Sequence, residues 1–273
     1  MTKPPAGAAN TDSGGGALES HLRRRRDAGA KLLIPYVTGG LDGWLDALRA
    51  AAANGADAIE IGIPFSDPVM DGPVIQEASY RALRAGATPQ SIFAALREVD
   101  VSIPLVVMCY YNTVFRAGHR RFAHDVRSAG VVGAIVPDLP LEEVGEWAAD
   151  ADAEGIETVM LAAPTADDAR IARIVQRARG FVYAVGLLGV TGERAELAST
   201  ALDIAARVKR ATTLPVLVGV GISNAEQAAA AVQVADGVIQ GASVVRRLME
   251  SGPDAVGDYV AQVRTAIDAV RTR

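Results

Sequence analysis

Eight short apolar segments, separated by stretches with helical periodicity, limit most strongly the folds open to this 273-residue chain. A short apolar run bounded by turn residues is typical of a buried strand. Near-continuous apolar strands that alternate with helices indicate a parallel sheet covered by helices. The predicted strands cover residues 31–37, 57–63, 104–108, 132–136, 157–162, 181–185, 215–219 and 235–239.

Predicted helices lie between these strands and at both ends. They cover residues 17–28, 44–54, 74–85, 89–99, 120–129 and 142–154, a segment from 167, residues 199–211, a segment from 224, and residues 244–250 and 253–270. Eight strand–helix units in roughly 250 residues match a (β/α)8 barrel. We therefore expect an α/β fold, a TIM barrel with extra short helices. A doubly wound open sheet is the alternative, but no Gly-rich dinucleotide fingerprint follows the first strand.

Composition sets the domain limits and the classes of partner. Residues 1–17 are rich in small and polar residues and are predicted to be a disordered tail, with a single barrel domain over 18–273. The net charge of −5 and the lack of a basic stripe argue against nucleic acid. No apolar run approaches the ~20 residues of a membrane span. The single cysteine, Cys109, and the lack of an apolar signal core favour the cytoplasm.

The segment 56–73 carries the strongest chemical signal. Glu60 interrupts an apolar strand, and Asp67 and Asp71 follow in a loop stiffened by prolines. Desolvation raises the pKa of a buried carboxylate, which makes Glu60 and Asp71 candidates for acid–base work. The alternative is that Glu60 pairs with a core arginine and that the aspartates only cap turns.

Other polar groups come at or near the ends of predicted strands. In such a barrel, catalytic groups lie at the carboxyl ends of the strands and in the loops that follow. The candidates besides Glu60 and Asp71 are Tyr36, Tyr110, Asp138 and Tyr183.

Glycine-rich turns follow the last three predicted strands. They are Gly189-Val190-Thr191-Gly192, Gly219-Val220-Gly221 and Gly241-Ala242-Ser243. Each could be a tight turn, but backbone N–H groups of glycine turns and a helix N-terminus together favour an anion. Loops after strands seven and eight form the usual phosphate site of this fold, so we expect a phosphorylated substrate.

The residues that Schiff-base and metal-dependent reactions need are not found at the expected positions. None of the three lysines is placed to form a Schiff base, and all three histidines fall on predicted helices or their starts. We predict no metal site, and we interpret Cys109 as a packing residue. Cofactor-free chemistry by carboxylates remains.

The motif Glu60-Ile61-Gly62-Ile63-Pro64-Phe65-Ser66-Asp67-Pro68, followed by Asp71-Gly72-Pro73, resembles the signature of the tryptophan synthase α subunit family. Further matches occur in the expected order: Pro35-Tyr36-Val37-Thr38, Tyr110-Tyr111-Asn112, Pro137-Asp138-Leu139-Pro140, Gly189-Val190-Thr191-Gly192 and Ala235-Asp236-Gly237-Val238-Ile239. The sequence departs from the family where Gly241-Ala242-Ser243 replaces the usual Gly-Ser-Ala.

The resemblance implies cleavage of indole-3-glycerol phosphate to indole and glyceraldehyde 3-phosphate. It implies that Glu60 protonates indole C3 and then takes the side-chain hydroxyl proton, while Asp71 binds the indole N–H. It further implies that Thr191 holds Asp71 on loop closure. The remaining implied substrate contacts are Tyr36, Tyr110, Asp138, Tyr183, Gly192, Val220, Gly221, Gly241, Ala242 and Ser243.

The resemblance also implies a partner. Members pair with a β subunit that carries pyridoxal phosphate, in an α2β2 complex, and Asp67, Pro68 and Asn112 would face it. This chain has no evident pyridoxal phosphate site. Two other functions stay open: a stand-alone indole-releasing lyase of another pathway, and a weakly catalytic paralogue that activates a β-type partner.

Overall fold

The strands form one closed parallel barrel. The computed structural model describes residues 15–186, 199–219 and 221–270. Each strand pairs in parallel with its neighbours in chain order, and β8 closes on β1. The strands are β1 (Leu32–Thr38), β2 (Ile59–Gly62), β3 (Leu105–Met108), β4 (Gly133–Ile135), β5 (Glu157–Ala162), β6 (Val182–Ala184), β7 (Val216–Val218) and β8 (Gly237–Gln240). The predicted (β/α)8 barrel is confirmed.

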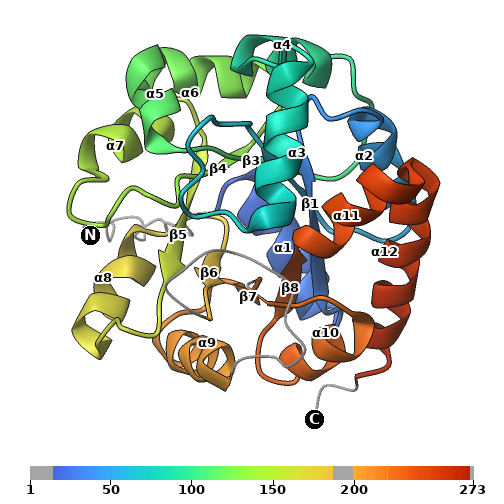
Figure 1. Ribbon diagram of the computed structural model, residues 1–273. Helices are drawn as coiled ribbons and strands as arrows, with labels where there is room; N and C mark the ends of the chain where they lie inside the picture. Colours follow the sequence, from blue (N-terminus) through green and yellow to red (C-terminus); the bar gives the residue numbers. More distant parts are fainter. Residues whose placement is uncertain (1–14, 187–198, 220, 271–273) are drawn as a thin grey trace, which may run out of the picture.

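Most of the helices surround the barrel as a ring, and α1 lies across one end of it (Figure 1). In the described residues they are α1 (Ala17–Asp27), α2 (Trp44–Ala53), α3 (Pro73–Arg84), α4 (Pro89–Leu96), α5 (Tyr111–Ala117), α6 (His119–Ser128), α7 (Gly145–Ala153), α8 (Asp168–Arg177), α9 (Ser199–Ala211), α10 (Ala225–Ala231), α11 (Ala242–Ser251) and α12 (Pro253–Asp268). None of these helices is long and apolar enough to cross a membrane. The predicted tail falls mainly on residues 1–14, outside the described part of the chain.

One helix was not expected. The sequence predicts no helix between the strand at 104–108 and the helix at 120–129, but α5 begins at Tyr111. The cap of α5 comes from another part of the chain, since the Tyr111 backbone N–H donates to Asp138 Oδ1 at 2.8 Å. A side-chain oxygen that accepts from the first turn stabilises a helix start.

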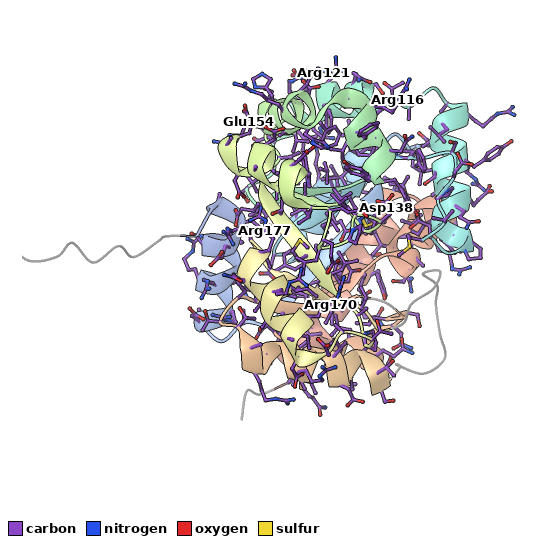
Figure 2. The ribbon with its side chains drawn as sticks, turned by 90° about the vertical axis from the view of Figure 1, so that its left-hand side faces the viewer. Arg116, Arg121, Asp138, Glu154, Arg170 and Arg177 are labelled. Atoms are coloured by element: carbon purple, nitrogen blue, oxygen red, sulfur yellow. The ribbon has the colours of Figure 1, made fainter. Side chains whose placement is uncertain are left out.

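Side chains alternate between the inside and the outside of the barrel, as the pleat of a strand requires. The inner set forms a separate apolar cluster that includes Ile34, Val106 and Ile239, and Leu18 and Leu22 of α1 close it from one end. The outer set packs under the helices, and α7 and α8 lie on the side that faces the viewer in Figure 2. Arg177 of α8 links these helices, because its Nη2 donates to Asp152 of α7 at 2.9 Å.

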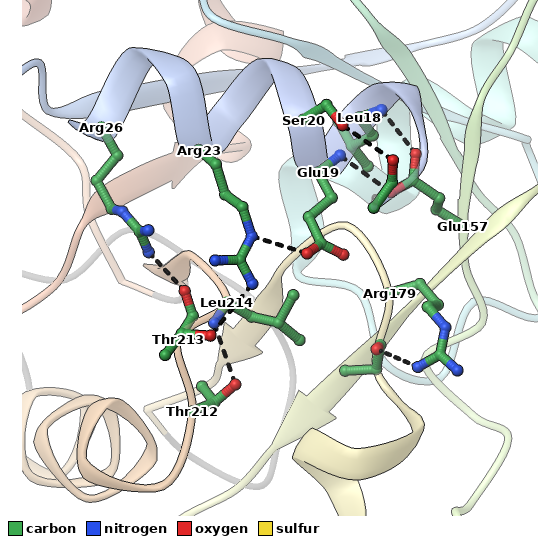
Figure 3. A network of polar contacts seen from close by, with 12 residues as sticks. Leu18, Glu19, Ser20, Arg23, Arg26, Glu157, Arg179, Thr212, Thr213 and Leu214 are labelled. Carbon is green, nitrogen blue, oxygen red and sulfur yellow. Dashed lines mark hydrogen bonds and ion pairs between the residues drawn. The ribbon is translucent and has the colours of Figure 1, made fainter. Parts of the chain in front are cut away.

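We call the carboxyl ends of the strands the mouth and the opposite ends, where α1 packs, the base. At the base, Glu157 at the start of β5 accepts the backbone N–H groups of Leu18 at 2.6 Å and Glu19 at 2.9 Å (Figure 3). A carboxylate at a helix N-terminus is stabilised by the N–H groups and the helix dipole. Glu157 therefore ties α1 to the barrel.

Two further acids anchor the base. Asp57 accepts from the backbone N–H of Leu33 and pairs with Arg25 at 2.7 Å and Arg264 at 3.1 Å. Asp236 accepts from the backbone N–H of Val216 and pairs with Lys209 at 2.6 Å. Both aspartates thus join the start of one strand to a neighbouring strand and to a cationic side chain.

Candidate active site

Glu60 points into the barrel from β2. It pairs with Tyr36 of β1 in the parallel register, and only 2% of its surface is exposed. Its Oε2 atom has no hydrogen-bond partner among the described residues, whose ion pairs do not include Glu60. Burial, and after it the charge of Asp71, raises the pKa of Glu60 to about 8. The alternative, in which Glu60 pairs with a core arginine, is therefore not seen, and the raised pKa favours the protonated form of Glu60 at neutral pH.

Asp71 reaches the same space from the loop between β2 and α3. Its backbone N–H donates to Pro68 O, and Gln76 Nε2 donates to the Asp71 carbonyl at 2.8 Å, so the loop is fixed on both sides. The Tyr110 hydroxyl donates to Asp71 Oδ2 at 3.1 Å. Burial raises the pKa of Asp71 to about 6, and the hydrogen bond from Tyr110 opposes that rise. Asp71 therefore ionises well before Glu60.

A hydrogen bond and a ring stack fix the position of Tyr110. The Met70 backbone N–H donates to the Tyr110 hydroxyl at 2.9 Å, and the Phe65 ring stacks on Tyr110 at a centroid distance of 5.1 Å. Sequence reasoning missed Phe65, although it lies inside the motif that carries the two acids. The stack and the hydrogen bonds join β3 to the loop that carries Asp71.

Two more tyrosines complete the cluster, and each lies against a glycine at the carboxyl end of the next strand. A Cβ atom on Gly62 would lie 1.8 Å from the Tyr36 hydroxyl, and one on Gly219 would lie 2.2 Å from the Tyr183 hydroxyl. Only glycine leaves room for these phenols. Burial and the charges of the two acids raise the pKa of Tyr36 and of Tyr183 well above the usual range, so both phenols stay neutral.

The glycine turns after β7 and β8 lie side by side because these strands pair. Gly221 is buried with φ +86°, a conformation that favours glycine, and a Cβ on Gly241 would meet nothing within 4 Å. Gly241 precedes α11 without a side-chain cap. Uncapped N–H groups at a helix start are suited to an anion.

Ser243 is predicted to be a substrate contact, and its hydroxyl lies in the interior of the protein. The side chain is fully buried, and its hydroxyl donates to Gln240 Oε1 at 3.4 Å. Ser243 can offer only its backbone N–H toward the mouth. Thr191, Gly192 and Val220 lie outside the described residues.

Asp138 lies beside the acid cluster rather than within it. Its carboxylate caps α5, and its charge helps to raise the pKa of Tyr110 and of Cys109. Asp138 and Arg170, both labelled in Figure 2, line a cavity of about 580 Å³ between β4, β5, α7 and α8. This cavity is separate from the acid cluster, because Glu60 and Asp71 do not line it.

The three residues predicted to face a partner lie on the outside. Asp67 and Asn112 are exposed and Pro68 is partly exposed. Val69 and Phe115, beside them in sequence, are 71% and 63% exposed. Cys109 is buried in the core, which raises the pKa of its thiol.

Two acids of unequal pKa, three neutral phenols and two glycine turns thus meet at the mouth of a closed parallel barrel. The fold, with polar groups gathered at the carboxyl ends of its strands, defines the class of (β/α)8-barrel enzymes. The model of the tryptophan synthase alpha chain family matches residues 22–270, and the chain belongs to that family.

Known tryptophan synthase alpha chains are similar to this chain over most of its length. The chain is 42% identical to the tryptophan synthase alpha chain of Streptomyces coelicolor, over 88% of this chain and 90% of the relative. It is 45% identical to that of Lactiplantibacillus plantarum, over 87% and 93%. Among solved structures, Mycobacterium tuberculosis tryptophan synthase superposes with a TM-score of 0.86 at 35% identity, covering 93% of this chain and 99% of that one. The alpha subunit from Legionella pneumophila gives 0.84 at 30% identity, covering 94% and 100%.

Proposed function

We propose that this chain cleaves indole-3-glycerol phosphate to indole and glyceraldehyde 3-phosphate by acid–base catalysis. The observation that carries the proposal is the pair of buried carboxylates at the mouth, where burial raises the pKa of Glu60 to about 8 and that of Asp71 only to about 6. The retro-aldol step needs one acid and one anion at the same pH. The family of the chain points to the same reaction.

Glu60 is the proton carrier in this proposal. Its carboxylic acid gives a proton to indole C3, which makes the bond from C3 to the side chain ready to break. The resulting carboxylate takes the proton of the adjacent side-chain hydroxyl, the carbon–carbon bond breaks as the aldehyde forms, and the electron pair returns to the ring. Glu60 ends protonated, so the acid is restored in each turnover.

Asp71 is the electrostatic residue. As an anion it accepts a hydrogen bond from the indole N–H, and it stabilises the positive charge that the ring carries after protonation. Tyr110 fixes the carboxylate of Asp71. The neutral rings of Tyr36, Tyr110 and Tyr183 would line the space for indole, and Asp138 would hold the neighbouring helix α5 in place.

The phosphate would bind at the turns after β7 and β8. Backbone N–H groups of Gly221, Gly241, Ala242 and Ser243 would contact it, with the positive end of the α11 dipole behind them. Gly192, Val220 and Thr191 belong to the proposal through the family motif alone, Thr191 as the partner of Asp71.

We further propose a β subunit as partner, in an α2β2 complex. The exposed apolar side chains Val69 and Phe115 adjoin Asp67, Pro68 and Asn112, which supports an interaction surface over the β2–α3 loop and α5. Pyridoxal phosphate would be held by the partner, and this chain would need no cofactor. The cytoplasm is the expected compartment.

Turnover of indole-3-glycerol phosphate by the purified chain tests the proposal. Indole and glyceraldehyde 3-phosphate are measured separately, with and without a β subunit. Equal amounts of both products, and faster turnover with the β subunit, are expected. High turnover that the β subunit does not change would favour a stand-alone lyase, and no turnover in either condition would refute the lyase function.

A further inference from the structure

One aromatic–cation stack lies directly behind the two glycine turns. The guanidinium carbon of Arg247, on α11, lies 3.7 Å from the ring centroid of Tyr259, on α12. Arg247 Nη1 donates to the Ser243 carbonyl at 2.7 Å, and the Tyr259 hydroxyl donates to the Ser223 carbonyl at 3.2 Å. Tyr259 is buried and Arg247 is partly buried, and the face of an aromatic ring attracts a guanidinium group.

The stack connects the two turns through α12, in addition to the pairing of β7 with β8. Ser243 lies in the first turn of α11, and Ser223 follows Gly221 in the turn between β7 and α10. α12 packs on both α10 and α11 (Figure 1). The path therefore runs from one glycine turn through Arg247 and Tyr259 to the other.

Hydrogen bonds hold the turn at Ser223 to the start of α10. The Ser223 backbone N–H and hydroxyl both donate to Gln227 Oε1, at 2.7 and 2.9 Å, and Gln227 N donates to Asn224 Oδ1 at 2.8 Å. Tyr259, only 4% exposed, bonds to this rigid turn. A shift of Tyr259 would thus be passed on to Gly221.

We propose that Arg247 and Tyr259 are positioning residues that set the spacing between the two turns, so that both present N–H groups to one phosphate monoester. The inference rests on the proposed function, since it gives that phosphate its site. Small displacements of anion-binding donors weaken binding strongly. The stack should therefore act on phosphate affinity and leave the acid–base step alone.

Four variants of the full chain test this: Arg247→Met, Arg247→Lys, Tyr259→Phe and the Arg247→Met, Tyr259→Phe pair. We expect Arg247→Met to raise the Kd for inorganic phosphate and the KM for indole-3-glycerol phosphate about three- to tenfold, with kcat changed less than about twofold. Tyr259→Phe keeps the ring and loses the bond to Ser223, so a smaller loss of the same kind is expected. The double variant should lose less than the two single losses multiplied, because both break one path.

Two comparisons separate positioning from other roles. An ammonium lacks the flat fork that covers the ring and reaches Ser243, so Arg247→Lys should behave like Arg247→Met. A normal Kd in Arg247→Lys would mean that charge alone matters and would overturn the proposal. The matched control is Arg84→Met, which removes an exposed arginine 5.8 Å from the Tyr80 ring and should change neither Kd nor KM.

The remaining outcomes are also decisive. A lowered melting temperature of Arg247→Met with an unchanged phosphate Kd would show a purely structural stack and overturn the proposal. If the wild-type chain binds phosphate but does not cleave the indole substrate, the lyase function fails while the phosphate data still decide on Arg247. If the wild-type chain does not bind phosphate, the positioning role falls.

Discussion

Buried acids occur at both ends of this barrel, and their surroundings differ. At the base, Asp57 contacts two arginines and a backbone N–H, and Asp236 contacts a lysine and a backbone N–H. At the mouth, Glu60 and Asp71 have no cationic partner among the described residues, and Glu60 Oε2 accepts nothing there. The base uses carboxylates as anchors, and the mouth keeps them short of partners.

The difference explains where stability and reactivity lie. A buried charge that is paired and hydrogen-bonded holds segments together, whereas a buried acid without partners keeps its proton to higher pH. The same residue type therefore has opposite effects at the two ends. Four single substitutions test whether the acids of the mouth serve turnover and those of the base serve stability.

The largest effect is expected for Glu60→Gln. The amide keeps the shape of the side chain but cannot transfer a proton, so kcat should fall about 1,000-fold with KM changed little. The unfolding free energy should not fall, because a neutral amide costs less to bury than a carboxyl group that ionises. Glu157→Gln at the base is the matched control, and it should retain turnover. A near-normal kcat in Glu60→Gln would show that Glu60 does not transfer the proton.

Asp71→Asn should lower kcat/KM by roughly 10- to 100-fold, the range of a lost hydrogen bond to a charged group. The effect is smaller than that of Glu60→Gln because Asp71 transfers no proton. Steady-state assays of indole release measure it. Loss of substrate binding with an intact kcat would instead assign Asp71 to binding alone.

Asp57→Asn probes the base. It leaves the charges of Arg25 and Arg264 without their buried partner, and we expect a loss of about 2–3 kcal/mol in unfolding free energy, measured in urea. Arg264 keeps its contact with Asp268, which limits the loss. The kcat of the folded variant should stay within about twofold of wild type. Lost activity without lost stability would contradict the assignment of the base as structural.

Tyr110→Phe should have the smallest effect. The hydrogen bond from Tyr110 opposes the rise in the pKa of Asp71, so its loss should raise that pKa further. The acid limb of the pH–rate profile should move to higher pH, with kcat at pH 8 reduced only a few-fold. An acid limb that stays in place would separate Tyr110 from the ionisation of Asp71.

The sequence predicted the barrel because its strands are buried and apolar on both faces, a pattern that local reading detects. It predicted Glu60 because a carboxylate in such a strand is unusual, and Asp71 because it follows in a loop stiffened by prolines. It could not predict α5, whose N-terminal cap, Asp138, lies 27 residues away in sequence. The stack of Arg247 on Tyr259 and the arginine pairs of Asp57 likewise join distant segments, and no local pattern marks them.

The buried hydroxyl of Ser243 shows a second limit. The order Gly241-Ala242-Ser243 fits a phosphate turn in sequence, but the start of α11 turns the Ser243 side chain toward Gln240. Which side of a helix start a residue occupies depends on the strand that precedes it. The register of β8 therefore decides which groups the turn can offer.

Titration of Glu60 tests directly whether the mouth of the barrel holds a carboxylic acid with a raised pKa. Glutamate carboxyl groups labelled with ¹³C can be followed by NMR from pH 4 to 9 in the wild-type chain and in Glu60→Gln. We predict one carboxyl that titrates near pH 8 and is lost in the variant. Because this folded-state pKa lies above the ordinary value of 4.5, the unfolding free energy should fall as pH rises from 4.5 to about 8, and Glu60→Gln should lessen that fall. A Glu60 carboxyl that titrates near 4.5 would refute its role as a proton donor.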